Sequence, residues 1–447
     1  MKLTLCAALI ILVAGCTTNI PSKLSELLEP IQQPAGGSAG QVENKFSTQE
    51  KAPDFKHKLL KHVAALPSVQ AAAYRIDVAK SELDLIDIGL GPSLTFSSDI
   101  GARKDDTAEN FGGLASVQGS KVFYDAGRAN LRKTIALNAV ETKKVDYIRA
   151  INTVLYELIR SQADKKYAEE LSKYLKSKQL EYEDNRNLIN MAAQNGIITS
   201  LDLLNLNEKL IGLEKREIDI RRIMNSVAVT EEKYQISDPK LFQFKLDYSQ
   251  LVDILETFEG NMNLAALLIE LDIAKLQVNF ERLGKSTSAD LAMRVSQEAS
   301  LGSDPEVFAG VQITLPMYDN GKMDKRVQMA EKNVSILKSE VDRYKIGSSS
   351  ELKLWKEEIE NHKQKLFSIQ KEIDNANEKV VELDKMLIAG KTSLMDIVNE
   401  KLNIASLETS KIDAVHAFRL TTLELLNSQT ALCLAISACD EISLQSF

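Results

Sequence analysis

Carboxylates and glycines that recur at a fixed spacing are the residues of this 447-residue chain that could do chemistry. Asp202 follows Gly196 at the same spacing as Asp396 follows Gly390. A carboxylate just after a turn can cap the helix that begins there, or it can line a polar opening that prefers cations. Both interpretations of the two aspartates are open from the residues alone.

The chain carries no pattern typical of a metalloprotein or a nucleotide-binding enzyme. CxxC, HExxH and P-loop motifs are missing from the sequence. A formal net charge of −8 also argues against the basic surface that nucleic-acid binding requires. We therefore expect no enzyme activity, no cofactor, no metal site and no nucleic-acid partner. The histidines have no metal-ligand spacing and are expected to be solvated: His57, His62, His362 and His416.

The N-terminus is typical of a bacterial lipoprotein leader. Lys2 supplies a positive charge, and the apolar run 3–13 is too short to span a bilayer. Small residues directly precede Cys16, which is the predicted lipidation site; an ordinary signal peptide with an incidental Cys16 is the alternative. Residues 1–15 are then the signal peptide, and 16–51, which contain many Pro, Ser, Gln and Gly residues, are a lipid anchor and extended tether.

Motifs recur along the chain at a constant offset of 194 positions, which predicts two copies of one unit. We assign 52–245 to the first repeat and 246–447 to the second. Residues that recur are Tyr124, Asp125 and Gly127 with Tyr318, Asp319 and Gly321, and Gly196, Thr199, Asp202 and Asn205 with Gly390, Ser393, Asp396 and Asn399.

Each repeat begins with a predicted helix, near 55–90 and near 250–284, followed by two strands. Polar and apolar residues alternate over 94–100 and again over 307–315, which is the period of a strand. Such a strand fits between lipid and water, although a soluble sheet packed on a core would alternate in the same way. The flanking long helices favour the first interpretation.

A very long helix and a return helix complete each repeat. Residues 128–195 contain neither Gly nor Pro, which predicts a helix roughly 100 Å long. The matching stretch 322–389 is interrupted only by Gly347. Apolar residues at three- and four-residue steps require long neighbouring helices to cover them. The predicted return helices run toward Pro239 and toward the C-terminus.

Cys433 and Cys439 lie near the C-terminus. In one continuous helix their Cα atoms would lie about 9 Å apart, which is too far for a disulfide. A disulfide therefore requires that the helix end between them. A disulfide and two buried thiols are both open from the sequence.

The order of predicted elements resembles that of the TolC family of outer-membrane factors. This order is helix, β-hairpin, long helix and return helix, and it occurs twice. The junctions 123–128 and 317–322 and the turn 390–398 carry the resemblance, which extends over the chain after about residue 50. Leu66–Val69 also looks like the start of the family's first helix, and Gly91–Pro92 like the entry to its first strand. It implies a mainly α fold with a small transmembrane β part. Three chains would form a 12-stranded β-barrel continued by a periplasmic α-helical barrel. An open sheet edge in lipid leaves costly unpaired backbone groups, which also favours closure by a homotrimer.

The resemblance implies the exit duct of a tripartite export system, lipid-anchored in the outer membrane with a large periplasmic part. Its partners would be a periplasmic adaptor (membrane fusion) protein and an inner-membrane ABC or proton-driven transporter. Type I protein secretion is the favoured cargo class, and small-molecule or multidrug efflux is the alternative. A lipid-anchored periplasmic coiled-coil adaptor or scaffold is an alternative of a different class.

The resemblance also implies roles for the recurring residues. The tip turns with Gly196, Thr199, Gly390 and Ser393 would contact the adaptor. Asp396 would line the periplasmic aperture together with Asn399, Asp202 and Asn205, although Asn399 stands where a second acidic residue is common. Residues Leu387–Ala389 replace the aromatic and basic residues that usually precede the turn glycine. The Tyr-Asp-X-Gly junctions are expected to shape the strand-to-helix transition without chemistry.

Overall fold

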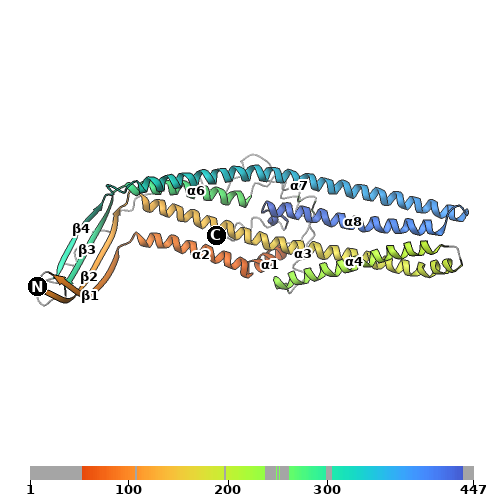
Figure 1. Ribbon diagram of the computed structural model, residues 1–447, viewed down its shortest axis with the longest axis horizontal. Coiled ribbons are helices and arrows are strands. Elements are labelled where there is room, and N and C mark those ends of the chain that lie inside the picture. Colours follow the sequence, from red (N-terminus) through yellow and green to blue (C-terminus); the bar gives the residue numbers. More distant parts are fainter. Residues whose placement is uncertain are drawn as a thin grey trace. The chain divides into compact units, whose positions relative to one another are not determined.

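The computed structural model describes residues 53–105, 108–195, 198–236, 248, 251, 261–298 and 305–435. The chain divides into the units Met1–Pro53 and Asp54–Phe447, and the elements discussed here belong to the second unit, apart from Pro53 itself. The helices (Figure 1) are α1 Pro53–Ala64, α2 Pro67–Gly89, α3 Arg128–Gln194, α4 Ser200–Lys233, α6 Met262–Arg282, the 3₁₀ helix η4 Leu283–Lys285, α7 Lys322–Ile388, α8 Leu394–Ser428 and α9 Leu432–Ala435. The strands are β1 Ser93–Asp105, β2 Ala108–Tyr124, β3 Ser288–Glu298 and β4 Glu306–Thr314.

The order of elements is α2-β1-β2-α3-α4, followed by α6-β3-β4-α7-α8. A mainly helical fold is therefore confirmed. The prediction of one helix near 55–90 is wrong in detail, because α1 ends at Ala64 and α2 begins at Pro67. Proline fits the first turn of a helix but has no backbone N–H to continue one from the preceding turn.

The two long helices match their predicted bounds within a residue. Both α3 and α7 contain 67 residues, so each is about 100 Å long. Helix α7 continues through Gly347, where a glycine costs about 1 kcal/mol relative to alanine. Packing just beyond this point offsets the cost, since Leu352, Trp355 and Ile359 lie against the largest cluster of buried residues. None of the described helices is both long enough and apolar enough to cross a membrane.

All four strands form one antiparallel sheet in the order β1-β2-β3-β4. The two hairpins are joined because β2 pairs with β3, with Val117 opposite Val295. Within the hairpins, Phe96 lies opposite Val117, and Val295 lies opposite Val307. Strands β1 and β4 are the edges of this sheet.

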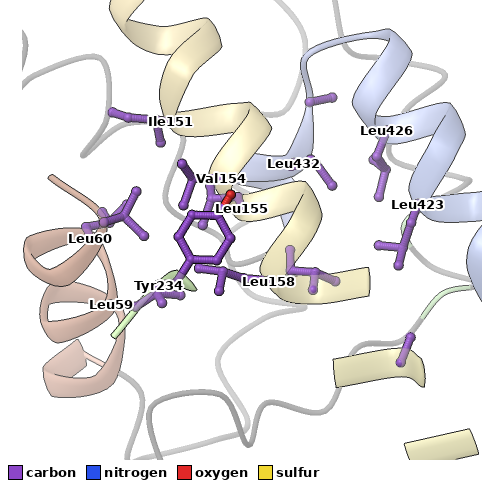
Figure 2. Packing of buried hydrophobic residues seen from close by; sticks show 14 of the residues in the cluster. Leu59, Leu60, Ile151, Val154, Leu155, Leu158, Tyr234, Leu423, Leu426 and Leu432 are labelled. Carbon is purple, nitrogen blue, oxygen red and sulfur yellow. The ribbon is translucent and has the colours of Figure 1, made fainter. Parts of the chain in front are cut away.

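One large cluster of buried residues, the central core cluster, holds the helices together (Figure 2). Leu155 of α3 is 1% exposed and Leu423 of α8 is fully buried. The cluster also contains Tyr234, just after α4. Its further members include Leu59, Leu60 and Val63 from α1, Ile151, Val154, Leu158 and Ile159 from α3, Ile359 from α7, Leu425 and Leu426 from α8, and Leu432 from α9.

The return helix of the second repeat ends before the C-terminus, although no Gly or Pro lies in this part of the chain. Helix α8 ends at Ser428, and Thr430 adopts a left-handed φ of 56°. Cys433 then lies in α9 and is disulfide-bonded. Its partner lies outside the described residues, as does Cys439.

Candidate pore surface and tip turns

One face of the sheet is apolar and exposed. Since directly paired residues point to the same side, the register places Phe96, Val117, Val295 and Val307 on this face. Phe96 is 69% exposed and Val307 is 67% exposed, so the described residues leave the face open. We call it the apolar sheet face; its other members include Leu94, Ile100, Leu291, Met293, Ala309, Val311 and Ile313.

The opposite face, the polar sheet face, carries hydroxyl, amide and charged groups. The Ser97 and Ser116 hydroxyls lie 2.7 Å apart, and Ser93 and Ser120 form a similar pair at 2.8 Å. The sheet thus separates an apolar side from a side suited to water, as strands between lipid and an aqueous lumen do. Other members of this face are Thr95, Asp99, Gln118, Asp290, Arg294, Ser296, Glu306 and Gln312.

The two strand-to-helix junctions are built alike. Asp125 accepts hydrogen bonds from the backbone N–H groups of Gly127 (2.9 Å) and Ala129 (2.5 Å). Asp319 accepts the equivalent bonds from Gly321 (3.0 Å) and Met323 (2.7 Å). These backbone bonds, that of Met323 first, lower the pKa of Asp319. Each aspartate therefore satisfies the first free N–H groups of a long helix.

Glycine is required at these junctions because the backbone is left-handed there. Gly127 has a φ of 86° and Gly321 a φ of 75°, and the preceding Ala126 and Asn320 also have positive φ. The tyrosines face solvent, since Tyr124 and Tyr318 are exposed. The junctions hold the backbone geometry, and among the described residues none of their hydrogen bonds indicates a catalytic role.

The second tip turn joins α7 to α8. Gly390 has a φ of 68° and donates its N–H to the carbonyl of Leu387 (2.9 Å), which ends α7. Ser393 then begins α8 through a capping box: its Oγ accepts from the N–H of Asp396 (3.2 Å), and its N–H donates to Oδ2 of Asp396 (2.9 Å). The hydroxyls of Ser393 and Thr392 donate to the same oxygen.

Asp396 is thus exposed but engaged in holding the turn. These bonds, with the Ser393 backbone N–H as the largest contribution, lower the pKa of its carboxyl group. The carboxylate therefore stays charged to lower pH than an ordinary aspartate. Capping, one of the two interpretations given by the sequence, accounts for the geometry seen within one chain. A role in a polar opening requires further copies of the chain.

The two tip turns are brought together by a small apolar cluster, the tip cluster. Ile198, just before α4, is buried with Met395 and Leu402 of α8, and Ala193, Leu203 and Val398 pack around them. Thr199 is exposed at this turn. Gly196 lies outside the described residues, as do the side chains of Asp202 and Asn205, whose backbone belongs to α4.

A second carboxylate near the tip was missed from the sequence. Glu400, next to Asn399, is only 10% exposed at its side chain and pairs with Lys379 of α7 at 2.5 Å. The Asn403 amide also donates to it (3.2 Å). The acidic residue near the turn is therefore directed into the α7–α8 pair and neutralised. No sequence motif marks this pair, because it depends on the register of two helices.

Farther along α8, Asp413 joins three helices. It accepts hydrogen bonds from the Tyr167 hydroxyl of α3 and the Arg216 guanidinium of α4, both at 2.7 Å. Burial, then the bond to Asp413, raises the pKa of Tyr167. His416 stacks on the Tyr167 ring and lies 3.1 Å from Asp164, with its side chain 14% exposed. The expectation that every histidine is solvated is therefore wrong for His416.

Among the described residues, no group of three or more potential metal ligands lies together. No protein-family model and no curated protein sequence matches the chain. Solved structures do match it. The outer-membrane channel OprN matches with a TM-score of 0.70 at 13% identity, over 85% of this chain and 90% of that chain.

Two further structures show the same likeness. The CmeC outer membrane channel of Campylobacter jejuni matches with a TM-score of 0.65 at 14% identity, over 88% of this chain and 89% of that chain. The outer membrane protein VceC from Vibrio cholerae matches with a TM-score of 0.66 at 12% identity, over 85% and 96%. The chain has the fold of a TolC-family outer-membrane channel. The printed names of two of these matched proteins describe outer-membrane channels, and that of the third an outer membrane protein.

Within this TolC-family fold, the junctions and the tip turns lie at opposite ends of the long helices. Helix α3 begins after the Asp125 junction and ends at the first tip turn, and α7 runs in the same way from the Asp319 junction to Gly390. A helix of this length separates the sheet from the tip cluster by about 100 Å.

Proposed function

We propose that this chain is the outer-membrane exit duct of a tripartite export system, in which three copies form a 12-stranded β-barrel continued by a periplasmic α-helical barrel. One observation carries the proposal: a four-stranded sheet exposes large apolar side chains along one face, and its edge strands β1 and β4 pair with no further strand of the described residues. An exposed apolar surface of this kind marks a membrane or protein contact. Open edges in lipid cost several kcal/mol per unpaired backbone group, and pairing β4 of one copy with β1 of the next removes them.

The helices support the same assembly. Helix α4 exposes Leu204, Ile211 and Ile218 at heptad spacing, which is the pattern of a helix that packs against another helix. Helix α7 exposes Ile336, Leu354, Phe367, Val381 and Ile388. Neighbouring copies around a three-fold axis would cover both sets through a heterologous contact that closes a ring.

The remaining assignments follow from this proposal. The repeats 52–245 and 246–447 are the duplicated units, and the tip turns at Gly196–Thr199 and Gly390–Ser393 meet a periplasmic adaptor, which links the duct to an inner-membrane transporter. Asp396, with Asn399, Asp202 and Asn205, lines the aperture. Residues 1–15 are removed as the signal peptide, and Cys16, which lies outside the described residues, then carries the lipid. Residues 16–51 form the tether.

Two cargo classes fit the duct. The Tyr-Asp-X-Gly junctions favour type I protein secretion, by resemblance to that branch of the family. An exposed arginine and phenylalanine side by side on the polar sheet face, Arg294 and Phe308, favour small molecules. Deleting the protein should therefore remove a secreted protein from the medium in the first case, and raise sensitivity to a small toxic compound in the second.

The first experiment measures the native mass of the full-length protein extracted in mild detergent from separated outer membranes. The expected result is a trimer in the outer-membrane fraction. A Cys16→Ser variant serves as the control, because a barrel should keep the trimer in the membrane without the lipid. A monomer or dimer that leaves the membrane when the lipid is missing would refute the duct and favour the adaptor or scaffold.

The aperture can be tested separately by single-channel conductance. Asp396→Asn removes the charge and should reduce the preference for cations over anions, because three carboxylates at one level attract cations. Ser393→Ala is the matched variant, since it weakens the same cap without removing charge. Equal cation preference in all three proteins would show that Asp396 only caps α8.

A further inference from the structure

We infer that the polar sheet face carries a binding site for a small, flat, amphipathic anion, such as an aromatic carboxylate, formed by Arg294, Gln118 and Phe308. The inference deepens the proposed function, and rests on it where it places the site in the lumen. The three residues lie in one row across the sheet, because Gln118 is directly opposite Arg294 and Arg294 is directly opposite Phe308. Directly opposite residues have Cβ atoms about 4.5–5.5 Å apart.

The guanidinium of Arg294 has the donors that an anion requires. It donates one hydrogen bond, to Oε1 of Gln118 at 3.3 Å, and forms no ion pair with a carboxylate of the described residues. Five N–H donors in a planar fork match a carboxylate bidentately. Arg294 is exposed, so a ligand can reach the remaining donors from the water-facing side.

Phe308 supplies the apolar part of the site. Its side chain is 53% exposed on the polar sheet face. Leu114 and Val122 are also exposed apolar side chains of this face, but each lies two rows away from Arg294. The ring lies across Gly310, where a Cβ atom would come within 3.0 Å of it. The ring therefore lies along the sheet over Gly310, on the strand next to that of Arg294, where the flat part of a ligand could stack on it.

The rows on the two sides of this row differ in charge. The next row toward the helices contains Ser120, Ala292 and Gly310, and the row on the other side contains Ser296 and Glu306. The carboxylate of Glu306 disfavours an anion on its side. The expected ligand therefore places its charge between Arg294 and Gln118 and its ring over Phe308.

The test is block of single-channel current by 1-naphthoate, with acetate and 1-naphthylmethylammonium as comparators, in planar bilayers with the full-length protein. Naphthoate should block at lower concentration than acetate. Arg294→Gln should weaken the naphthoate block about tenfold, which corresponds to the loss of one charge-assisted contact. Phe308→Ser should remove the preference for naphthoate over acetate, and Glu306→Gln should strengthen the block.

Lys121→Gln is the matched control, because it removes one positive charge from the same sheet. Lys121 lies opposite Leu291 and so belongs to the apolar sheet face. This variant should be blocked like the unaltered protein. The proposed site would be refuted if naphthoate blocked the Arg294→Gln variant as strongly as the unaltered protein. It would also be refuted if the naphthyl cation blocked the channel more strongly than naphthoate.

A second measurement separates this site from the duct itself. All three residues come from one chain, so saturation-transfer NMR on the detergent-extracted protein should detect naphthoate whether or not channels form. The signal should fall in the Arg294→Gln variant and persist in Lys121→Gln. Binding without channels would refute the proposed duct, whereas channels without binding in either experiment would refute the site.

Discussion

The central core cluster and the sheet differ in where their apolar side chains are buried. Leu155 and Leu423 are buried almost completely by helices of the same chain, whereas Phe96 and Val307 remain about two-thirds exposed. Burying a large apolar side chain contributes about 1.5–3 kcal/mol. A single chain can therefore hold its helices together, while the sheet obtains this stabilisation only from lipid or from other copies. Folding of the helices and assembly of the sheet should be separable steps.

The sharpest test of this difference is Phe96→Arg. In water the change should be nearly neutral, because the side chain is exposed in one chain. Against lipid, an arginine on the outer face of a strand costs about 2–4 kcal/mol near the bilayer midplane, and a trimer carries three copies. We expect loss of the membrane-embedded trimer with normal helix content by circular dichroism.

Thr95→Arg is the matched control for this prediction. Thr95 is adjacent in β1 and exposed, but it belongs to the polar sheet face. This variant should assemble normally. If both variants lose the trimer equally, the two faces of the sheet do not differ in their surroundings, and the comparison with the central core cluster fails.

The second prediction concerns a substitution inside the central core cluster. Leu155→Ala should lower the free energy of unfolding by about 2–5 kcal/mol, because it leaves a cavity between α1, α3 and α8. Unlike Phe96→Arg, it should reduce helix stability and membrane assembly together. Leu354→Ala on α7, where the leucine is exposed, is the control and should change helix stability little in a single chain. Denaturant unfolding of the detergent-extracted protein gives both values.

Much of this fold could be predicted from the sequence because its signals are local. A stretch without Gly or Pro predicted α3, a stretch interrupted only by Gly347 predicted α7, and the alternation of polar and apolar residues predicted strands. Positive φ at Gly127 and Gly321 explains why the junction motif recurs. Periodicity alone predicted one helix near 55–90 and missed the break between α1 and α2, whereas the resemblance indicated a helix start at Leu66–Val69. Pairing of β2 with β3 could not be predicted, because it joins residues more than 160 positions apart.

The contacts of the tip turns and of α8 were harder to predict from the sequence, because most of them are not local. The capping box of Ser393 and Asp396 is local, and capping was one interpretation of Asp396 from the start. The Lys379–Glu400 pair and the contacts of Asp413 depend on the register between helices, which composition and spacing do not give. Whether Asp396 also lines an opening depends on other copies of the chain, which a single sequence does not place.

A smaller effect is expected from Asp413→Asn. This variant tests whether the tip halves of α4 and α8 can be destabilised without destabilising the central core cluster. The variant weakens the contacts to Tyr167 and Arg216, and because the groups are partly exposed we expect a loss of about 1–2 kcal/mol. Amide hydrogen exchange should speed up in the tip halves of α4 and α8 but not around Leu155. Asp342→Asn, an exposed change on α7, is the control. Uniformly faster exchange would show that the central core cluster is not an independent unit.

The smallest effect should come from Ser393→Ala, at the tip farthest from the sheet. Loss of this cap should destabilise the start of α8 by about 1 kcal/mol, seen as faster exchange of its first amides. Ser406→Ala, at an exposed serine of α8, is the control. The folded pKa of Asp396 is lowered chiefly by the Ser393 backbone N–H, so its contribution is present above the unfolded pKa of about 3.9 and is lost as the pH falls through the folded value. The variant keeps this backbone N–H and loses only the Ser393 hydroxyl, a further donor that lowers the pKa of Asp396. The part of the difference that comes from the hydroxyl–carboxylate bond should therefore be full at pH 7 and shrink below about pH 4. A difference that stays constant down to pH 2 would mean that the charge of Asp396 does not hold this turn, and that its carboxylate is free to serve the aperture alone.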